Sequence, residues 1–368
     1  MCKGRAVGPT ASYFKEDCLK RPVTILSLAT ATPPHELSQE AALQTSRTLL
    51  AAQFRDFERM SAVFANAGIA FRQLARPAEW YLRPQGFPER TAVYLEVALD
   101  LFVAAASAAL AEARIDADAI DTIVTVSSTG IATPGLEARA MGRMGFRSDV
   151  ERVPVFGLGC AGGVSGLSLA AKLARVSPGS TVLFVTVELC SLALRTDDVS
   201  KADIISAALF GDGAAACVVR VGDEGFAEIT GNAETTWPDT LDIMGWNMEP
   251  NGLGVVLNRA IPAFARRNMA EAMEKMLGGQ NLRIGDIDRF ICHPGGAKVV
   301  DAMETALSLN QGSLDHEREV LRLHGNMSAP TVLFVLDRVR AQEMPPLSVL
   351  TALGPGFTAS AVTLRRAA

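Results

Sequence analysis

The stretch VPVFGLGCAGGVSGLSLAAKLAR, residues 153–175, predicts a strand, a tight turn and a helix. Five glycines surround Cys160, and Val164, Leu167 and Ala171 then recur with a helical period. Glycine allows the backbone to bend sharply and another molecule to approach closely. A thiol at a helix N-terminus is favoured as thiolate, its nucleophilic form, but many free cysteines are simply small buried hydrophobes. This stretch alone leaves both roles open for Cys160.

Length, composition and net charge limit the classes of protein to which the chain can belong. With 368 residues, the chain exceeds one ordinary hydrophobic core, so two domains or one large double-layered unit are expected. Hydrophobic residues make up 49% and charged residues 20%, which indicates a globular chain and not a disordered one. The formal net charge of -5 argues against a general nucleic-acid-binding protein, which normally carries a basic excess.

Cysteine spacing and hydropathy bear on location. Six dispersed cysteines without a CxxC pair suggest neither a disulfide framework nor a structural zinc site. The N-terminal residues show no charged segment followed by an apolar one, so no secretory signal is expected. The most apolar helical segment, Val93 to Leu110, contains Glu96 and Asp100, so we expect no membrane span and a cytoplasmic location.

Strands and helices alternate along the chain, which predicts an α/β protein. We expect a loose arm at residues 1–21 and a loop at 72–90, where prolines gather. Strands are expected at residues 23–29, 121–127, 153–156, 180–188, 210–220, 226–235, 290–292 and 347–353. Helices are expected at residues 38–59, 91–114, 136–145, 164–175, 261–276, 297–309 and 326–340.

The two halves of the sequence echo each other weakly. Each contains a strand, a glycine-containing turn with a chemically capable residue, and a helix. Cys160 has this context in the first half, and His293 and Asn326 have it in the second. We therefore expect a duplicated α/β unit, with one half at residues 1–225 and the other at residues 226–368.

His293 and Asn326 occupy positions where chemistry is plausible but not required. Pro294 disfavours helical geometry at His293, so its ring is expected at the end of a strand, where α/β proteins gather their sites. Asn326 follows Gly325 and is expected near the start of a helix. Taken singly, a turn histidine bound by backbone and an asparagine N-cap explain both residues.

Five motifs taken together resemble the type III polyketide synthases, the chalcone and stilbene synthase family. In order they are GLGCAGG at 157–163, LFGDGAA at 209–215, HPGG at 293–296, GNMS at 325–328 and GPG at 354–356. The resemblance covers nearly the whole chain. It implies a thiolase-like fold, in which a duplicated α/β unit forms five layers in the order αβαβα.

The resemblance also implies the chemistry. Cys160 would accept the acyl group, and His293 would hold it as thiolate in an ion pair. His293 and Asn326 would then donate hydrogen bonds to the thioester oxygen of malonyl-CoA, where an enolate develops as carbon dioxide leaves. A thiolate is needed because a neutral thiol attacks thioesters poorly. Acyl-CoA and malonyl-CoA are substrates, and neither a cofactor nor a metal is expected.

Further site residues follow from matched positions. The acyl cavity is expected to involve Phe210, Ser128, Cys190, Ala193, Val255, Ser328, Gly354, Pro355 and Gly356. The phosphates of coenzyme A are expected to meet Arg55, Arg59 and Lys298, although Asp56 and Val63 replace the family's usual lysines. A solvated helix face explains the two arginines equally well.

Small residues at several cavity positions, among them Cys190, Ala193 and Val255, suggest a longer or wider apolar tunnel than in plant chalcone synthases. They resemble bacterial members that use fatty acyl-CoA starters to make alkylpyrones or alkylresorcinols, although neutral packing changes explain them too. The resemblance implies a homodimer. Thr133 replaces the methionine that reaches into the partner's cavity in the family, which leaves that cross-subunit contact open.

Three alternatives remain. A 3-oxoacyl-(acyl-carrier-protein) synthase of the initiating type shares the fold and the Cys–His–Asn set, but it normally carries a glutamine-centred motif where this chain has Pro294, Gly295 and Gly296. A hydroxymethylglutaryl-CoA synthase would need a glutamate near Cys160, and none stands in the expected helix context. A non-catalytic acyl-binding protein would not need the three residue types that are present here.

Overall fold

Strands from both halves of the chain join in one nine-stranded mixed sheet. The computed structural model describes residues 21–177, 179–194, 199–249 and 251–367, so the predicted arm lies outside the described residues except for Arg21. In pairing order the strands are β11 (Arg289–Cys292), β12 (Leu347–Gly354), β13 (Thr358–Arg366), β8 (Ala227–Thr236), β1 (Val23–Ala31), β7 (Asp212–Val221), β6 (Thr181–Leu189), β4 (Thr122–Val126) and β5 (Glu151–Val155).

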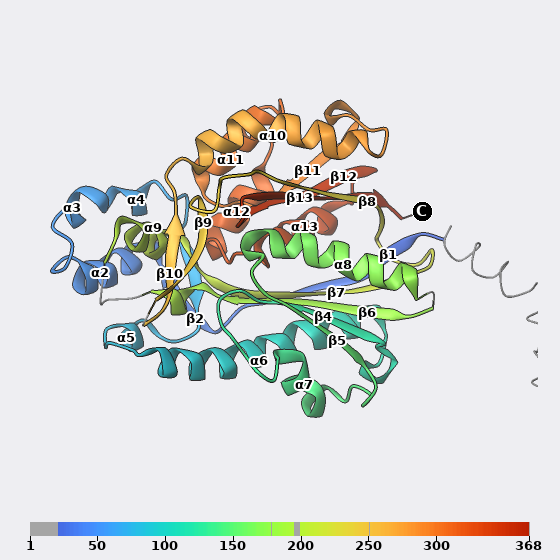
Figure 1. Cartoon of the computed structure of the whole chain (residues 1–368), viewed down its shortest axis with the longest axis horizontal. Coiled ribbons are helices and arrows are strands. Elements are labelled where there is room, and N and C mark those ends of the chain that lie inside the picture. Colours follow the sequence, from blue (N-terminus) through green and yellow to red (C-terminus); the bar gives the residue numbers. More distant parts are fainter. Residues whose placement is uncertain (1–20, 178, 195–198, 250, 368) are drawn as a thin grey trace, which may run out of the picture.

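The strand pairing is shortest where the two halves of the sheet meet. The β1–β8 ladder pairs only Thr24 with Glu228 and Ile25 with Ala227, whereas β1 and β7 pair along nearly their whole length. Parallel pairing occurs between β4 and β5, β4 and β6, and β11 and β12, and the other ladders are antiparallel. The short β1–β8 contact lets the two halves of the sheet diverge and face each other (Figure 1).

Helices fill the space between the two half-sheets and cover their outer faces (Figure 1). The central pair is α8 (Gly162–Val176) and α13 (Thr331–Gln342), and the outer pairs are α6 (Phe87–Ala113) with α7 (Leu136–Met144) and α10 (Ile261–Gly278) with α11 (Ala297–Ala306). The resulting order of helix, sheet, helix, sheet and helix confirms the predicted five-layer α/β architecture.

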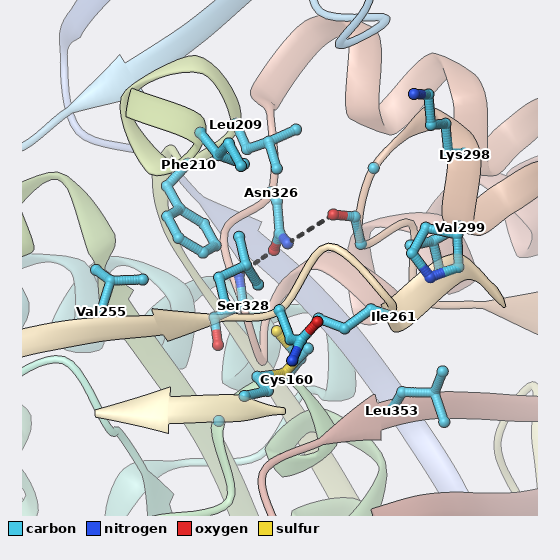
Figure 2. A pocket seen from close by; sticks show the side chains of 18 of the residues that line it. Cys160, Leu209, Phe210, Val255, Ile261, Lys298, Val299, Asn326, Ser328 and Leu353 are labelled. Atoms are coloured by element: carbon cyan, nitrogen blue, oxygen red, sulfur yellow. Dashed lines mark hydrogen bonds between the residues drawn. The ribbon is translucent and has the colours of Figure 1, made fainter. Parts of the chain in front are cut away.

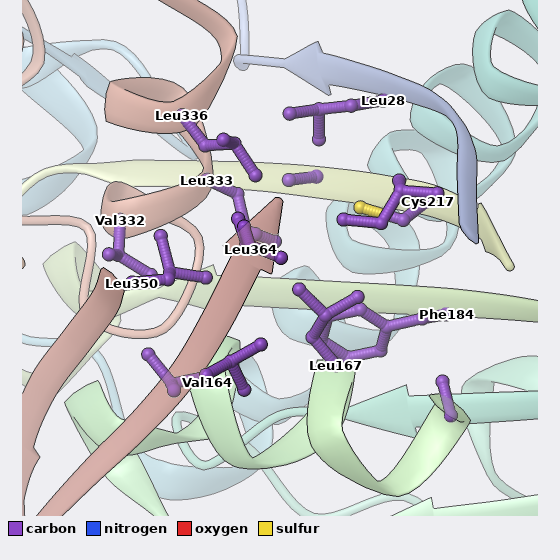
Figure 3. Packing of buried hydrophobic residues seen from close by; sticks show 14 of the residues in the cluster. Leu28, Val164, Leu167, Phe184, Cys217, Val332, Leu333, Leu336, Leu350 and Leu364 are labelled. Carbon is purple, nitrogen blue, oxygen red and sulfur yellow. The ribbon is translucent and has the colours of Figure 1, made fainter. Parts of the chain in front are cut away.

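The central helices supply the main core. Figure 3 shows Val164 and Leu167 of α8 beside Phe184 of β6, with Leu333 of α13 near Leu364 of β13. These side chains are fully buried, and burying each one stabilises the fold by about 1.5–3 kcal/mol. The N-terminal ends of the two helices are in direct contact, because a Cβ on Gly163 would lie 2.2 Å from the carbonyl oxygen of Ala329.

Helix α6 is long and apolar enough to cross a membrane by length and composition, which corrects the expectation that charges interrupt it too strongly. In the structure, however, 56% of its most apolar window is buried inside the protein. Its charged residues Glu96 and Asp100 face outward, where they pair with Arg76 and Arg143. The helix therefore packs as the core helix of a globular domain.

Shorter elements surround the cavity that is described in the next section. They are the helices α2 (Gln39–Leu50), α3 (Phe57–Met60), α4 (Ala62–Ala65), α5 (Ala78–Tyr81), α9 (Lys201–Leu209) and α12 (Asp315–His324), and the strands β2 (His35–Ser38), β3 (Phe71–Leu74), β9 (Met244–Glu249) and β10 (Gly252–Leu257). Short 3-10 turns complete them: η1 (Ala117–Ala119), η2 (Gly159–Ala161), η3 (Cys190–Ala193) and η4 (Ile284–Asp286).

Two predicted segments differ from the structure. The helix expected at 38–59 ends at Leu50, and the chain then turns so that Phe57 packs, 1% exposed, against α2 and α9. The loop expected at 72–90 contains β3, α5 and the first turn of α6. Pro77 caps α5 and Pro88 lies in the first turn of α6, where proline costs no helical hydrogen bond.

Candidate active site

Cys160 lies on the short turn η2, between β5 and the N-terminus of α8, as its surrounding glycines predict. Gly159 has φ +48, and a Cβ there would lie 2.7 Å from the Pro355 ring, so both the turn and the packing require glycine. The Cys160 side chain is 6% exposed and lines a cavity. The turn thus presents a thiol to a cavity while burying it almost completely.

Ser128 and Glu188 brace this turn from behind. The Ser128 hydroxyl accepts hydrogen bonds from the backbone N–H groups of Gly157 and Gly159, each at 3.2 Å. The buried Glu188 carboxylate accepts the Ser128 N–H at 2.9 and 3.0 Å and the Thr129 hydroxyl at 2.7 Å. Burial raises the pKa of Glu188 to about 8. The sequence predicted Ser128 only in the cavity wall, and it predicted Glu188 as a buried polar residue of the active-site wall without a catalytic role.

Ser128→Ala is expected to lower the free energy of unfolding by about 1–3 kcal/mol, because two N–H groups of the turn lose their acceptor. Ser128→Thr keeps the hydroxyl and serves as the matched control. Urea unfolding of the two variants measures the difference. Equal stability of the alanine and threonine variants would show that the hydroxyl does not hold the turn.

His293 extends β11 toward the same cavity. Its backbone N–H donates to the Thr351 carbonyl at 2.8 Å, and its own carbonyl accepts the Gly295 N–H at 3.0 Å. The side chain is 6% exposed, and both ring nitrogens are buried without a hydrogen-bond partner among the described residues. Burial lowers the pKa of His293 to about 3, which favours the neutral ring, in which one nitrogen can donate a hydrogen bond and the other can accept one.

Asn326 is not an N-cap, because α13 begins at Thr331 with Pro330 as its cap. Instead it forms an isolated β-bridge with Phe210: its N–H donates to the Leu209 carbonyl at 2.8 Å, and its carbonyl accepts the Gly211 N–H at 3.0 Å. Gly211 permits this approach, since a Cβ there would lie 2.3 Å from a backbone oxygen of α12. The bridge fixes the Phe210 and Asn326 backbones side by side.

The Asn326 amide has a defined orientation (Figure 2). Its Oδ1 accepts the Ser328 N–H at 2.8 Å, which only an oxygen can do, so Nδ2 must take the other position. Nδ2 donates to the Gly295 carbonyl at 3.3 Å, and its second hydrogen is available to Cys160 or to a bound acceptor. The site therefore presents an amide donor beside Cys160 and His293.

Burial acts against both charges of the expected Cys160–His293 ion pair, which stays a prediction. Burial raises the pKa of the Cys160 thiol to about 11, although hydrogen bonds with the Ser328 and Asn326 side chains act in the opposite direction. Burial also lowers the pKa of His293, so both shifts favour the uncharged forms. Burial thus disfavours both the thiolate and the imidazolium before a substrate is bound.

The cavity has a volume of about 460 Å³. The predicted residues that line it are Cys160, His293, Asn326, Phe210, Ser128, Cys190, Val255, Pro355, Ser328, Arg59 and Lys298. Much of the remaining wall is apolar, and its residues include Ile205, Leu209, Ile261, Val299, Met303 and Leu353. The N-terminal and C-terminal halves of the chain thus build one shared cavity.

Four predicted residues lie elsewhere among the described residues. Ala193 lines a separate small cavity of about 60 Å³, which shares Cys190 and Phe210 with the large one. Gly354 does not line the large cavity, because it packs against the Cys160 turn, where a Cβ would lie 2.6 Å from the Ala161 side chain. Gly356 and the exposed Arg55 do not line it either.

Exposed cations mark the mouth of the cavity. Lys298 and Arg59 are exposed lining residues, and Arg59 pairs with Asp56 at 2.6 Å. Arg259, which sequence reasoning missed, lines the mouth from the turn between β10 and α10. Its position follows from the β9–β10 hairpin, which the strand pattern did not reveal. These cations can receive the phosphates of an anionic substrate.

Comparison with known proteins identifies the family. Models of the chalcone and stilbene synthases match in two blocks, the N-terminal domain at residues 83–223 and the C-terminal domain at residues 228–368. A 1,3,6,8-tetrahydroxynaphthalene synthase from Streptomyces peucetius subsp. caesius is 38% identical over 367 residues, which cover 98% of this chain and 97% of the relative.

Solved structures agree with the fold. The 1,3,6,8-tetrahydroxynaphthalene synthase of Streptomyces coelicolor A3(2), described as a bacterial type III polyketide synthase, matches with a TM-score of 0.89 at 28% identity, covering 94% of this chain and 99% of that one. CsyB complexed with CoA-SH matches with a TM-score of 0.87 at 24% identity over 94% of this chain and 100% of that one, a likeness of fold alone.

These relatives do not single out the alkylresorcinol and alkylpyrone synthases, so that finer prediction stays a prediction. The family is nevertheless decided, and with it the choice against a 3-oxoacyl-(acyl-carrier-protein) synthase. The chain belongs to the chalcone and stilbene synthase family and is a type III polyketide synthase, an acyltransferase of thiolase-like fold that condenses malonyl-CoA with loss of carbon dioxide.

Proposed function

We propose that this enzyme loads a fatty acyl-CoA starter on Cys160, extends it with malonyl-CoA and cyclises the product to an alkylpyrone or alkylresorcinol. The observation that carries the proposal is the large cavity beside Cys160, with its mostly aliphatic wall. Apolar lining with a few convergent polar groups is typical of sites that bury an apolar ligand. The starter's alkyl chain would gain from leaving water for this wall.

In the loading step, Cys160 Sγ attacks the starter thioester carbonyl while its proton moves to the neutral His293 ring. The new carbon–sulfur bond forms as the bond to coenzyme A breaks, and the departing thiolate takes the proton from His293. Coenzyme A leaves as a thiol and the acyl group remains on Cys160. The unpartnered ring nitrogens of His293 support this role, since nothing competes for the proton.

In the extension step, malonyl-CoA loses carbon dioxide, and the electrons of the broken carbon–carbon bond form an enolate. Hydrogen bonds from Asn326 Nδ2 and a His293 N–H stabilise the enolate oxygen without a metal ion. The enolate carbon then attacks the acyl group on Cys160, and the sulfur departs as thiolate. The fixed orientation of the Asn326 amide supports this role, because Nδ2 lies toward Cys160.

A second candidate is supported by the similar proteins. Both tetrahydroxynaphthalene synthases named above are full-length matches. In that case malonyl-CoA alone would supply starter and extender, and the product would be a hydroxynaphthalene. Few cations lie deep in the cavity, since Arg59, Lys298 and Arg259 stand at its mouth. This distribution favours an uncharged acyl starter over an extra malonyl carboxylate at depth.

A starter ladder distinguishes the two candidates. Purified enzyme receives malonyl-CoA alone, or with acetyl-, hexanoyl-, dodecanoyl- or palmitoyl-CoA or a phenylpropanoid CoA ester, and products are identified by mass spectrometry. We expect the long-chain starters to give alkylated pyrones or resorcinols at the highest kcat/KM. A hydroxynaphthalene from malonyl-CoA alone, with no fatty acyl product, would establish the second candidate. Turnover of only the phenylpropanoid would refute both.

We further propose that the enzyme works as a homodimer in the cytoplasm. Two large apolar side chains support an interface, because Phe156, four residues before Cys160 in the chain, is 53% exposed, and Ile131, three residues after Ser128, is 49% exposed. Sedimentation equilibrium measures the assembly directly. A monomer across micromolar concentrations would contradict the proposed dimer without affecting the assignment of starter.

A further inference from the structure

The strand that leads to His293 lies at the edge of the sheet. β11 is the first strand in the sheet order and pairs only with β12. In a strand, successive N–H groups point to opposite sides. The His293 N–H points toward β12, where Thr351 accepts it at 2.8 Å. The preceding N–H, that of Cys292, therefore points away from the sheet and needs an acceptor from outside it.

Glu317 supplies that acceptor. It lies on α12, its side chain is fully buried, and its Oε1 accepts the Cys292 N–H at 2.9 Å. Its Oε2 accepts a hydrogen bond at 2.6 Å from Arg289, the first residue of β11. One carboxylate thus holds both ends of a four-residue strand, in place of a neighbouring strand.

The His293 ring depends on this support. Among the described residues neither ring nitrogen has a hydrogen-bond partner, so no side-chain contact of that kind orients the ring. Its place in the cavity follows from the backbone, which Thr351 holds on one side and which Glu317 holds one residue earlier on the other. A displacement of about 1 Å at a reacting group can cost a hundredfold in rate.

We propose that Glu317 is a positioning residue, which sets the place of the His293 ring in the cavity through the Cys292 N–H. The inference rests on the role proposed above for His293, but it is independent of which starter the enzyme uses. Glu317 does not line the cavity and touches no reacting atom. Its removal leaves a buried N–H without an acceptor immediately before His293, and the strand end must shift to satisfy it.

The test is the decarboxylation of malonyl-CoA by Glu317→Ala and Glu317→Gln. We expect the alanine variant to lose kcat by about tenfold to a hundredfold with KM nearly unchanged, because the mouth of the cavity is untouched. The glutamine variant keeps an oxygen for the Cys292 N–H and should recover most of the lost rate. Loss of stability alone would lower the folded fraction and not this rate per folded molecule.

Glu304 provides a matched control. It is 2% exposed, its Oε1 accepts the N–H groups of Gly312 and Leu314 at 2.9 and 3.0 Å, and it pairs with Arg318. It therefore has the same chemistry as Glu317 but braces a different loop. Glu304→Ala should cost comparable stability and leave kcat nearly unchanged. An equal loss of kcat in both alanine variants would overturn the proposal.

Two further variants keep the result interpretable. If Glu317→Ala does not fold, Glu317→Asp replaces it, because its shorter side chain withdraws the acceptor while keeping the charge, and kcat should again fall. His293→Gln tests the underlying role. If His293→Gln decarboxylates normally, the role of His293 is wrong. If only His293→Gln loses rate and the Glu317 variants do not, the positioning role alone is wrong.

Discussion

Cys160→Ala is expected to abolish polyketide formation, with a loss of at least about four orders of magnitude, because it removes the thiol that is proposed to hold the growing chain. The substitution removes only a sulfur from a turn whose backbone is fixed by Ser128. His293 and Asn326 remain, so decarboxylation of malonyl-CoA should continue at a measurable rate. Product mass spectrometry and carbon dioxide release report the two reactions separately.

The matched control is Cys190→Ala, since Cys190 is a second buried thiol that lines the same cavity. Incubation with a labelled acyl-CoA should give a covalent adduct in the Cys190 variant and none in the Cys160 variant. A label that survives Cys160→Ala would move the nucleophile elsewhere. A loss of carbon dioxide release together with polyketide formation would mean that the thiol also takes part in decarboxylation.

Asn326→Asp is expected to slow malonyl-CoA decarboxylation by about a hundredfold to a thousandfold, which is the usual cost of losing one donor to a developing oxyanion. Aspartate keeps the size of the side chain and the oxygen that accepts the Ser328 N–H. It replaces the donor near the Gly295 carbonyl with a second acceptor, which repels the enolate. The variant should still fold and still load starter on Cys160.

Loading and decarboxylation can be measured in the same preparation, by adduct mass and by carbon dioxide release. Intact loading with slow decarboxylation assigns Asn326 to the enolate. Near wild-type decarboxylation in Asn326→Asp would contradict that assignment. His293→Ala differs, because it should slow both steps if the ring accepts the thiol proton as well as donating to the enolate.

The elements that could be predicted from sequence are those whose signals are local. The glycines around Cys160 and the helical period after it predicted the turn and α8, and Pro294 predicted the strand end at His293. These signals act within a few residues of the chain. The five sequence motifs predicted the family and its catalytic residues, because together they report a site that no single segment contains.

What could not be predicted depends on contacts between distant segments. Asn326 has the local pattern of an N-cap, so its motif and not its local pattern predicted its place in the site, and its bridge with Phe210 could not be foreseen. Ala193 and Cys190 share the turn η3, but only Cys190 lines the large cavity, so a matched position did not specify which way a side chain points. Glu317 gave no signal, because its partner is a backbone N–H.

The contact between Gly163 and Ala329 has a consequence for how activity arises during synthesis. It joins the helix that follows Cys160 to the segment that follows Asn326, so the site exists only after the two central helices have met. On a ribosome, Cys160 emerges well before His293 and Asn326. An incomplete chain then carries a thiol without its base, which thioesters acylate only slowly. We therefore expect the complete catalytic site only in chains whose two central helices have docked.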